Sequence, residues 1–298
     1  MNAIPSAGRR WLTWALATTL LWGVWGAATS ISIARGFPET LIYVVWAAVM
    51  VLPTLFILAR NGWRVDTSLP AVAMGLAIGL LGAGGQLLLF HAVTIGPSYL
   101  IFPVISLSPV VTIALSITLL RERTGLLGWA GIALALIALP LFDFSPQGEA
   151  SGGLGWFLLA LLVMAAWGLQ AFVMKFANSR MSAESIFVYM TLTALLLAPA
   201  AWWMTDWSRP VNWGWDGPWL AAAIQLLNAV GALTLVFAFR YGKAIVVAPL
   251  TNAGAPLITA LIALVAAGVV PGPLKAVALV LALIAAALLA LTAERDPD

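Results

Sequence analysis

The side chains most able to bind a small molecule are a few uncharged polar groups set inside long apolar runs. They are Gln86, His91, Gln170, Gln225, Asn228 and Asn252, with Ser106, Ser108 and Thr251 beside them. A polar group in hydrocarbon without a partner is costly, so each should face the interior of a helix bundle. There it either lines a cavity or braces two helices, and the sequence leaves both roles open.

Aromatic residues accompany these polar groups deep inside the apolar runs. Such rings either fill a core or line a cavity that accepts a flat or apolar side chain. The resulting candidate substrate-binding set is Trp22, Trp167, His91, Tyr99, Gln86, Asn252, Tyr43 and Phe237.

Catalytic and cofactor chemistry lack the residues they need. The chain has no cysteine and a single histidine, so neither a thiolate site nor a histidine metal site is expected. The acidic residues Glu39, Glu122, Asp143 and Glu184 all stand at the ends of apolar runs, so a buried carboxylate for a cation antiporter is missing. The lysines have no Gly-rich phosphate-binding context. We therefore expect neither an enzyme nor a cofactor, and no ATP-driven pump.

Composition places the chain in a membrane. Of 298 residues, 63% are hydrophobic and 8% charged, against about 25% charged in an average soluble domain. A bilayer core takes about 20 apolar residues of helix. On that scale ten spans are expected, at 12–34, 39–59, 70–92, 97–120, 125–142, 154–176, 184–204, 217–239, 244–267 and 272–292.

The basic residues give these spans a direction. With a cytoplasmic N-terminus, the inner segments hold Arg9, Arg10, Arg60, Arg64, Arg121, Arg123, Lys175, Arg180, Arg240, Lys243 and Arg295. The outer segments hold Arg35, Arg209 and Lys275. This asymmetry predicts a multi-pass protein of the inner membrane with both termini in the cytoplasm. The net charge of +3 is too small and too scattered to suggest a nucleic acid partner.

The sequence repeats itself weakly at an offset of 145 residues. Trp22-Gly23 overlies Trp167-Gly168, and one further residue of shift brings Gly85 onto Gly231. Two repeats are expected, residues 1–145 and 146–298. Because five spans is an odd number, the second repeat must be inverted relative to the first. Inverted repeats are a usual framework of alternating-access transporters, with the substrate site near the middle of the membrane.

Prolines occur inside the fourth and ninth spans, which occupy matching places in the two repeats. Pro103 and Pro109 lie in the fourth, and Pro249 and Pro256 in the ninth. A proline removes one helical hydrogen bond and kinks the helix. These four residues either shape packing alone or serve as hinges beside a cavity, and we take them as candidate hinges.

The ten-helix inverted duplication resembles the drug/metabolite transporter superfamily, EamA type. Trp22-Gly23, its echo Trp167-Gly168, and the proline-bearing fourth span that closes on Arg121-Glu122-Arg123 carry the resemblance. The ninth span looks like the second copy of the fourth but has Gly268 where the first copy has its Glu. Within the superfamily the chain is most similar to the YddG-type aromatic amino acid exporters. That resemblance implies a central cavity formed by spans one, three, four, six, eight and nine.

We therefore expect a secondary transporter that exports aromatic and other neutral amino acids by alternating access, without cofactor or metal. Export of another small metabolite, such as a nucleobase or drug-like compound, is the alternative. The expected partners are the lipid bilayer and the substrate, with the chain a monomer or weak dimer.

Overall fold

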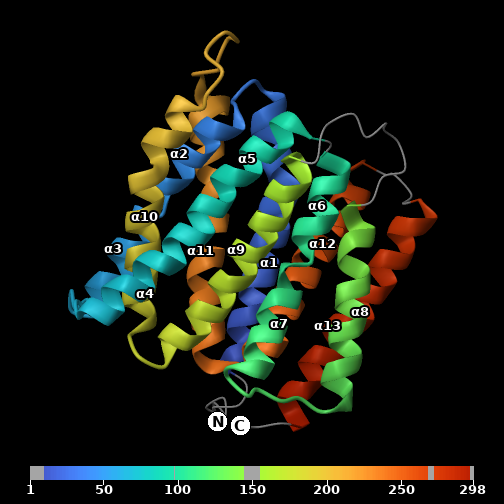
Figure 1. The fold of residues 1–298 in the computed structure, drawn as a ribbon. Coiled ribbons are helices and arrows are strands. Elements are labelled where there is room, and N and C mark those ends of the chain that lie inside the picture. The colour runs from blue at the N-terminus through green and yellow to red at the C-terminus, as the bar shows by residue number, and fades with distance from the viewer. Residues whose placement is uncertain (1–9, 97, 144–154, 268–271, 296–298) are drawn as a thin grey trace, which may run out of the picture.

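The computed structural model describes residues 10–96, 98–143, 155–267 and 272–295, and its regular structure within these ranges is helical. Figure 1 shows the helices arranged as one bundle. The first half contains α1 (Arg10–Ala34), α2 (Glu39–Val49), α3 (Val51–Arg60), α4 (Leu69–Gly79), the π-helical η2 (Leu80–Gly84), α5 (Gly85–Ile95), α6 (Ser98–Ser106), α7 (Ser108–Thr118) and α8 (Leu126–Asp143). The second half contains α9 (Gly155–Asn178), α10 (Ala183–Trp203), the π-helical η3 (Trp215–Trp219), α11 (Leu220–Tyr241), α12 (Ala244–Ala267) and α13 (Pro273–Arg295).

These elements join end to end into the ten expected spans. α2 and α3 form the second, α4, η2 and α5 the third, α6 and α7 the fourth, and η3 and α11 the eighth. Within the described ranges, eight helical segments are long and apolar enough to cross a membrane, and two shorter apolar helices, Val104–Thr118 and Leu126–Leu141, complete the ten. The predicted fold class is confirmed.

Two of the interruptions within spans have a local cause in proline. Pro53 and Pro109 lack the N–H that would bond to the carbonyl four residues earlier. The second span accordingly breaks at Met50, and the fourth breaks at Leu107. After the second break the helical hydrogen bonds resume with that from the Val110 N–H to the Leu107 carbonyl, at 2.9 Å. α12 behaves differently, since it stays helical through both Pro249 and Pro256.

The bundle has two ends, named here from Figure 1. The start of α1 and the end of α13 lie at the same end, which we call the lower end. The opposite, upper end carries a group of exposed tryptophans, as expected of rings in a membrane interface. They are Trp202, Trp203, Trp207, Trp213, Trp215 and Trp219.

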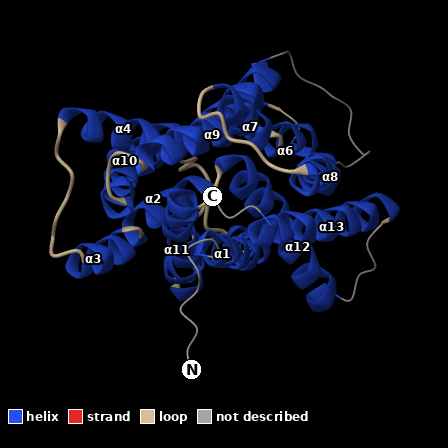
Figure 2. Cartoon of the chain, turned by 90° about the horizontal axis from the view of Figure 1, so that it is seen from below, coloured by secondary structure: helices blue, strands red, loops and turns tan. Residues whose placement is uncertain are grey.

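The packing of the spans repeats between the halves. α1, the first span, packs against α11 and α12, which belong to spans eight and nine. α9, the sixth span, packs against α5 and α7, which belong to spans three and four. Each half thus inserts its first helix between the third and fourth spans of the other. The fifth and tenth spans, α8 and α13, pack on each other at one edge of the array (Figure 2).

Candidate functional site

A tryptophan of α1 is seated against a glycine of α11. The indole N–H of Trp22 donates to the backbone carbonyl of Asn228 at 3.3 Å. A Cβ at Gly231 would lie 2.5 Å from Cδ1 of that ring, so only glycine leaves the ring room. The sequence predicts close packing for this glycine but does not show that Trp22 is what it packs against.

The same contact occurs a second time between α9 and the third span. The indole N–H of Trp167 donates to the carbonyl of Gly82 at 3.2 Å, and a Cβ at Gly85 would lie 2.6 Å from its Nε1. Trp167 stands 145 residues after Trp22, and Gly231 stands 146 residues after Gly85. The repeat seen weakly in the sequence is therefore present in the tertiary contacts.

The glycines that follow the two tryptophans form a second duplicated contact. The hydroxyl of Thr259, on α12, donates to the Gly23 carbonyl at 2.9 Å. The hydroxyl of Thr112, on α7, donates to the Gly168 carbonyl at the same distance. The backbone of α7 also lies close to this glycine, since a Cβ at Gly168 would be 2.5 Å from the Ser108 carbonyl oxygen. Each Trp-Gly pair thus holds its helix to two spans of the opposite half, one on each side.

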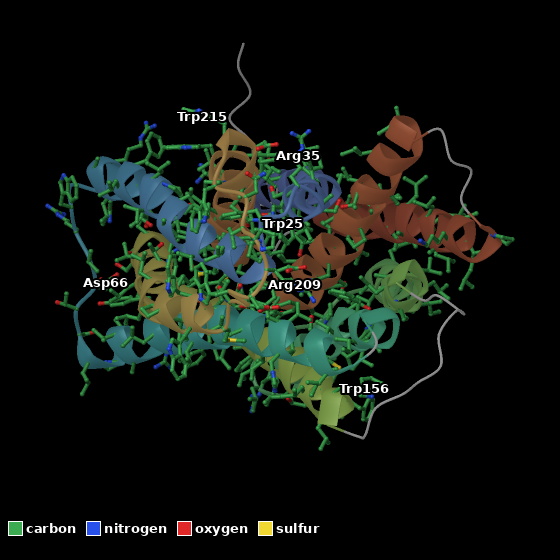
Figure 3. All side chains as sticks on the ribbon, turned by 90° about the horizontal axis from the view of Figure 1, so that it is seen from above. Trp25, Arg35, Asp66, Trp156, Arg209 and Trp215 are labelled. Carbon is green, nitrogen blue, oxygen red and sulfur yellow. The ribbon has the colours of Figure 1, made fainter. Side chains whose placement is uncertain are left out.

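Amides brace the α1–α11 crossing above Trp22. The indole N–H of Trp25 donates to Gln225 Oε1 at 3.2 Å. Asn228 Nδ2 lies 3.4 Å from the same oxygen, and Gln225 Nε2 reaches Thr29 Oγ1 at 3.5 Å. Gln225 is only 3% exposed, so its hydrogen-bonding groups are directed to protein partners. Of the two roles open to it, bracing is the one its contacts fit. In the view down the bundle in Figure 3, Trp25 and Arg35 lie on the same side.

Gln86, His91 and Asn252 lie on the helices packed around the two tryptophans. Gln86 is half-buried and His91 exposed, both on α5, the helix that receives Trp167 through Gly85. Asn252 is half-buried on α12, and its Nδ2 donates to the Ala248 carbonyl at 2.9 Å, which leaves Oδ1 available.

The remaining predicted aromatic residues are distributed over three places. Tyr43 is 1% exposed, donates to the Ala194 carbonyl at 3.4 Å and packs edge-on against Phe90. Phe237 stacks on Trp14 with ring centroids 4.9 Å apart, below Gly231 on α11. Tyr99 falls in α6, and its side chain lies outside the described part of the structure.

The four predicted hinge prolines are placed unequally. Pro109 is buried in the first turn of α7, directly after the break at Leu107. Pro249 is buried and Pro256 half-buried within continuous α12. Pro103 falls in α6, and its side chain is outside the described part.

At the lower end, the fourth span turns across to cap the ninth. Arg121 takes a left-handed conformation, φ 56°, just after α7, which is uncommon for a residue other than glycine. The turn brings the Glu122 carboxylate to the start of α12, where Oε2 accepts the Ile245 N–H at 3.0 Å. A carboxylate there satisfies an unpaired N–H and is favoured by the helix dipole.

The lower ends of α9 and α11 are also joined. Lys175 Nζ donates to the last carbonyls of α11, at 3.2 Å to Phe239 and 2.6 Å to Gly242. In the reverse direction Arg240 donates to the carbonyl of Asn178, the last residue of α9, at 2.5 Å and to that of Met181, in the connection to α10, at 2.7 Å. Basic groups at helix C-termini are favourable. In the sequence these residues indicate only orientation, so their pairing was not predicted.

Asp66 makes a third lower-end connection, between the halves. It lies in the segment joining α3 to α4, at the edge of the bundle in Figure 3. Its carboxylate accepts the Ser182 N–H at 2.8 Å and the Ser182 hydroxyl at 2.7 Å, at the start of α10. These hydrogen bonds, the backbone one first, lower the pKa of the Asp66 carboxyl below its ordinary value. The Tyr189 hydroxyl donates to the Asp66 carbonyl at 2.7 Å.

Spans four and nine pack on each other in the lower half. α12 packs against α7, whereas in the described part α6, the upper half of span four, packs mainly on α8 and α9. Within the described residues, span nine therefore packs on span four through its lower part, α7. No cluster of three His, Cys, Asp or Glu side chains suited to a metal ion occurs among the described residues.

Comparison with known proteins adds two findings. A family model described as the EamA-like transporter family matches the chain twice, over residues 9–142 and 154–291. A solved structure described as "Crystal structure of protein" superposes with a TM-score of 0.76 at 21% sequence identity, over 95% of this chain and 97% of that one, and so shares the fold. The search of curated proteins gave no match.

Proposed function

The chain belongs to the EamA-like transporter family, whose members are membrane transporters of small metabolites and not enzymes; on that premise we propose that it exports aromatic and other neutral amino acids by alternating access. We further propose that the two repeats divide at residues 145 and 146. That boundary lies outside the described residues, in the interval between the two family matches.

The observation that carries the proposal is the pair of repeat-related tryptophans accompanied by uncharged amides. Trp22 and Trp167 are half-buried rings at equivalent helix crossings, and Gln86 and Asn252 supply half-buried amides on the adjoining helices. In the described helices the charged side chains stand near helix ends, outside the middle of the spans. Such surroundings favour a neutral zwitterion with an aromatic side chain over a strongly charged substrate, because no counter-charge is at hand.

We assign the lower end to the cytoplasm and the membrane to the inner membrane. The excess of Lys and Arg in segments at that end supports the orientation. The Glu122 cap, the Lys175 and Arg240 bonds and the α7–α12 packing all lie there. They support a state that is closed toward the cytoplasm.

Opening toward the cytoplasm would then separate α7 from α12 and α9 from α11. The break at Leu107 and the prolines of spans four and nine are the places where helix direction can change at the lowest cost in hydrogen bonds. We propose Pro103, Pro109, Pro249 and Pro256 as the hinge set.

Reconstituted vesicles test this function directly. Vesicles loaded with unlabelled phenylalanine should accumulate labelled phenylalanine by exchange, saturably, whereas a channel would show no such counterflow. Competition by a panel of neutral amino acids, nucleobases and drug-like cations then sets the substrate class. Competition by a nucleobase or drug-like compound without any by amino acids would replace our proposal with the alternative.

Paired variants connect the activity to the site. Trp22→Ala and Trp167→Ala should each weaken competition by aromatic amino acids more than competition by alanine. Trp129→Ala removes a tryptophan that is 43% exposed on α8 and is the matched control. If all three variants lost competition by aromatic amino acids equally, the proposed site would be wrong, although the proposed transport activity could still be right.

A further inference from the structure

A groove of about 690 Å³ lies in the lower half of the molecule, apart from the two tryptophan contacts. Its walls are apolar side chains of α1, α3 and α11, and its lower rim carries Arg60, Asn61 and Glu184. Its volume is in the range of small-molecule sites. Phe237, from the predicted substrate-binding set, lines this groove together with Trp14, on which its ring stacks.

The groove exists because its two walls are braced separately. Thr54 and Thr191 share a hydrogen bond of 2.7 Å that ties α3 to α10. Thr18 and Thr234 share one of 2.9 Å that ties α1 to α11. α3 and α11 themselves make little contact, so a space remains between the two braced pairs.

The groove opens to the side of the bundle. Figure 2 shows α3 and α11 at the outer edge of the helix array. On the α3 wall, Leu52 is 57% and Phe56 58% exposed. In a multi-pass protein, apolar side chains exposed at this position face lipid chains.

The rim presents one charge of each sign. The Arg60 guanidinium lies over the Phe56 ring at 5.5 Å, which holds it at the mouth of the groove. Glu184 is half-buried in the first turn of α10. Neither side chain forms an ion pair with another described residue.

We propose that this groove binds a phospholipid with a primary-amine headgroup. One acyl chain fills the apolar groove, Arg60 donates to the phosphate and Glu184 accepts from the ammonium. Guanidinium groups match phosphate oxygens in geometry and charge. An anionic lipid without an amine would satisfy Arg60 through its phosphate but would bring no cation to Glu184. A trimethylammonium headgroup carries no N–H to donate to Glu184.

This inference depends on the chain's place in a bilayer, not on its substrate. The test is native mass spectrometry of the purified full chain, incubated with phosphatidylethanolamine, phosphatidylglycerol and phosphatidylcholine of identical acyl chains. Phosphatidylethanolamine should be retained about tenfold over each competitor, as expected of a charged hydrogen bond that only this lipid completes.

Two charge variants and their controls assign the rim. Glu184→Gln should abolish the preference for phosphatidylethanolamine over phosphatidylcholine, whereas Glu39→Gln, at the start of α2 and outside the groove, should keep it. Arg60→Gln should lower retention of all three lipids, because each carries a phosphate, whereas Arg123→Gln, exposed at the lower end beyond α7, should not.

A third variant tests the groove itself without touching charge. Leu52→Trp adds bulk from the exposed wall, so the chain should fold and elute normally while lipid retention falls. Equal retention of the three lipids by the natural chain, preference for phosphatidylglycerol, or full retention by Leu52→Trp would each overturn the proposal.

Discussion

The duplicated tryptophan–glycine contact makes a quantitative prediction at Gly85. Alanine there would place Cβ 2.6 Å from Trp167 Nε1 and 2.9 Å from Cδ1. Because carbon contacts are favourable near 3.5–4.0 Å, the indole must withdraw by about 1 Å. Its bond to the Gly82 carbonyl, already 3.2 Å, would then be lost.

The expected cost follows from three contributions. Overpacking costs about 1–3 kcal/mol and the lost hydrogen bond about 1 kcal/mol. Alanine returns up to about 1 kcal/mol through its higher helix propensity. Gly85→Ala should therefore destabilise the protein by about 1–3 kcal/mol, and Gly231→Ala should do the same through Trp22.

The assay is thermal unfolding in detergent, with the neighbouring glycine as control. At Gly84 an added Cβ would meet only Leu80 Cδ1 of its own span, at an ordinary 3.5 Å, so Gly84→Ala should be neutral or stabilising. Adding Trp167→Phe to Gly85→Ala should recover stability relative to the sum of the two single changes, since contacting residues couple. Strict additivity, or equal melting temperatures for Gly84→Ala and Gly85→Ala, would refute the contact.

Three further predictions concern the bonds around this core. Thr112→Val and Thr259→Val should each cost about 1 kcal/mol and about equally, because each removes the same repeated bond to a glycine carbonyl; thermal unfolding that separates them widely would contradict the symmetry. Lys175→Met should destabilise the lower end by about 1.5–3 kcal/mol, because it removes both bonds to backbone carbonyls. The chain has no cysteine, so a single cysteine introduced at the lower end can report on opening. This cysteine should be labelled faster in Lys175→Met than in Lys275→Met, whose lysine is exposed. The lowered pKa of Asp66 implies stabilisation that is complete above the ordinary carboxyl pKa and is lost as pH falls through the folded-state value. In Asp66→Asn the free energy of unfolding should therefore fall less steeply as the pH is lowered through the acid range. The same pH dependence in the variant and the natural chain would contradict this reasoning.

Much of the fold could be predicted from the residues because a bilayer constrains the chain so strongly. Each crossing needs about 20 apolar residues in a helix, since backbone groups find no other partner in hydrocarbon. Ten such runs are readable in the sequence, and Pro109, one of the predicted hinge residues, marks one of the breaks. The finer breaks are not readable, since Pro249 and Pro256 have the same sequence signal and leave α12 helical.

The candidate site was predictable in part. Trp22 and Trp167 stand out through the repeat, and their positions at equivalent crossings agree with it. The glycines they contact were recognisable as packing residues but not as their partners. Gln225 was recognisable as a buried amide, but its contact with Trp25 joins residues 200 positions apart. No local pattern records such a distance.

By itself the sequence determined that the chain crosses a membrane as ten helices in two opposed sets, because hydropathy and helix length act within each segment. The tertiary structure decided which helices touch: that α1 lies between α11 and α12, that Glu122 reaches the start of α12, and that α3 and α11 leave a groove between them. Those outcomes depend on the shapes of surfaces brought together from distant parts of the chain. In a bilayer the helix faces that pack on protein and those that face lipid are both apolar. The close packing of small residues and the hydrogen bonds between helices therefore decide which helices associate.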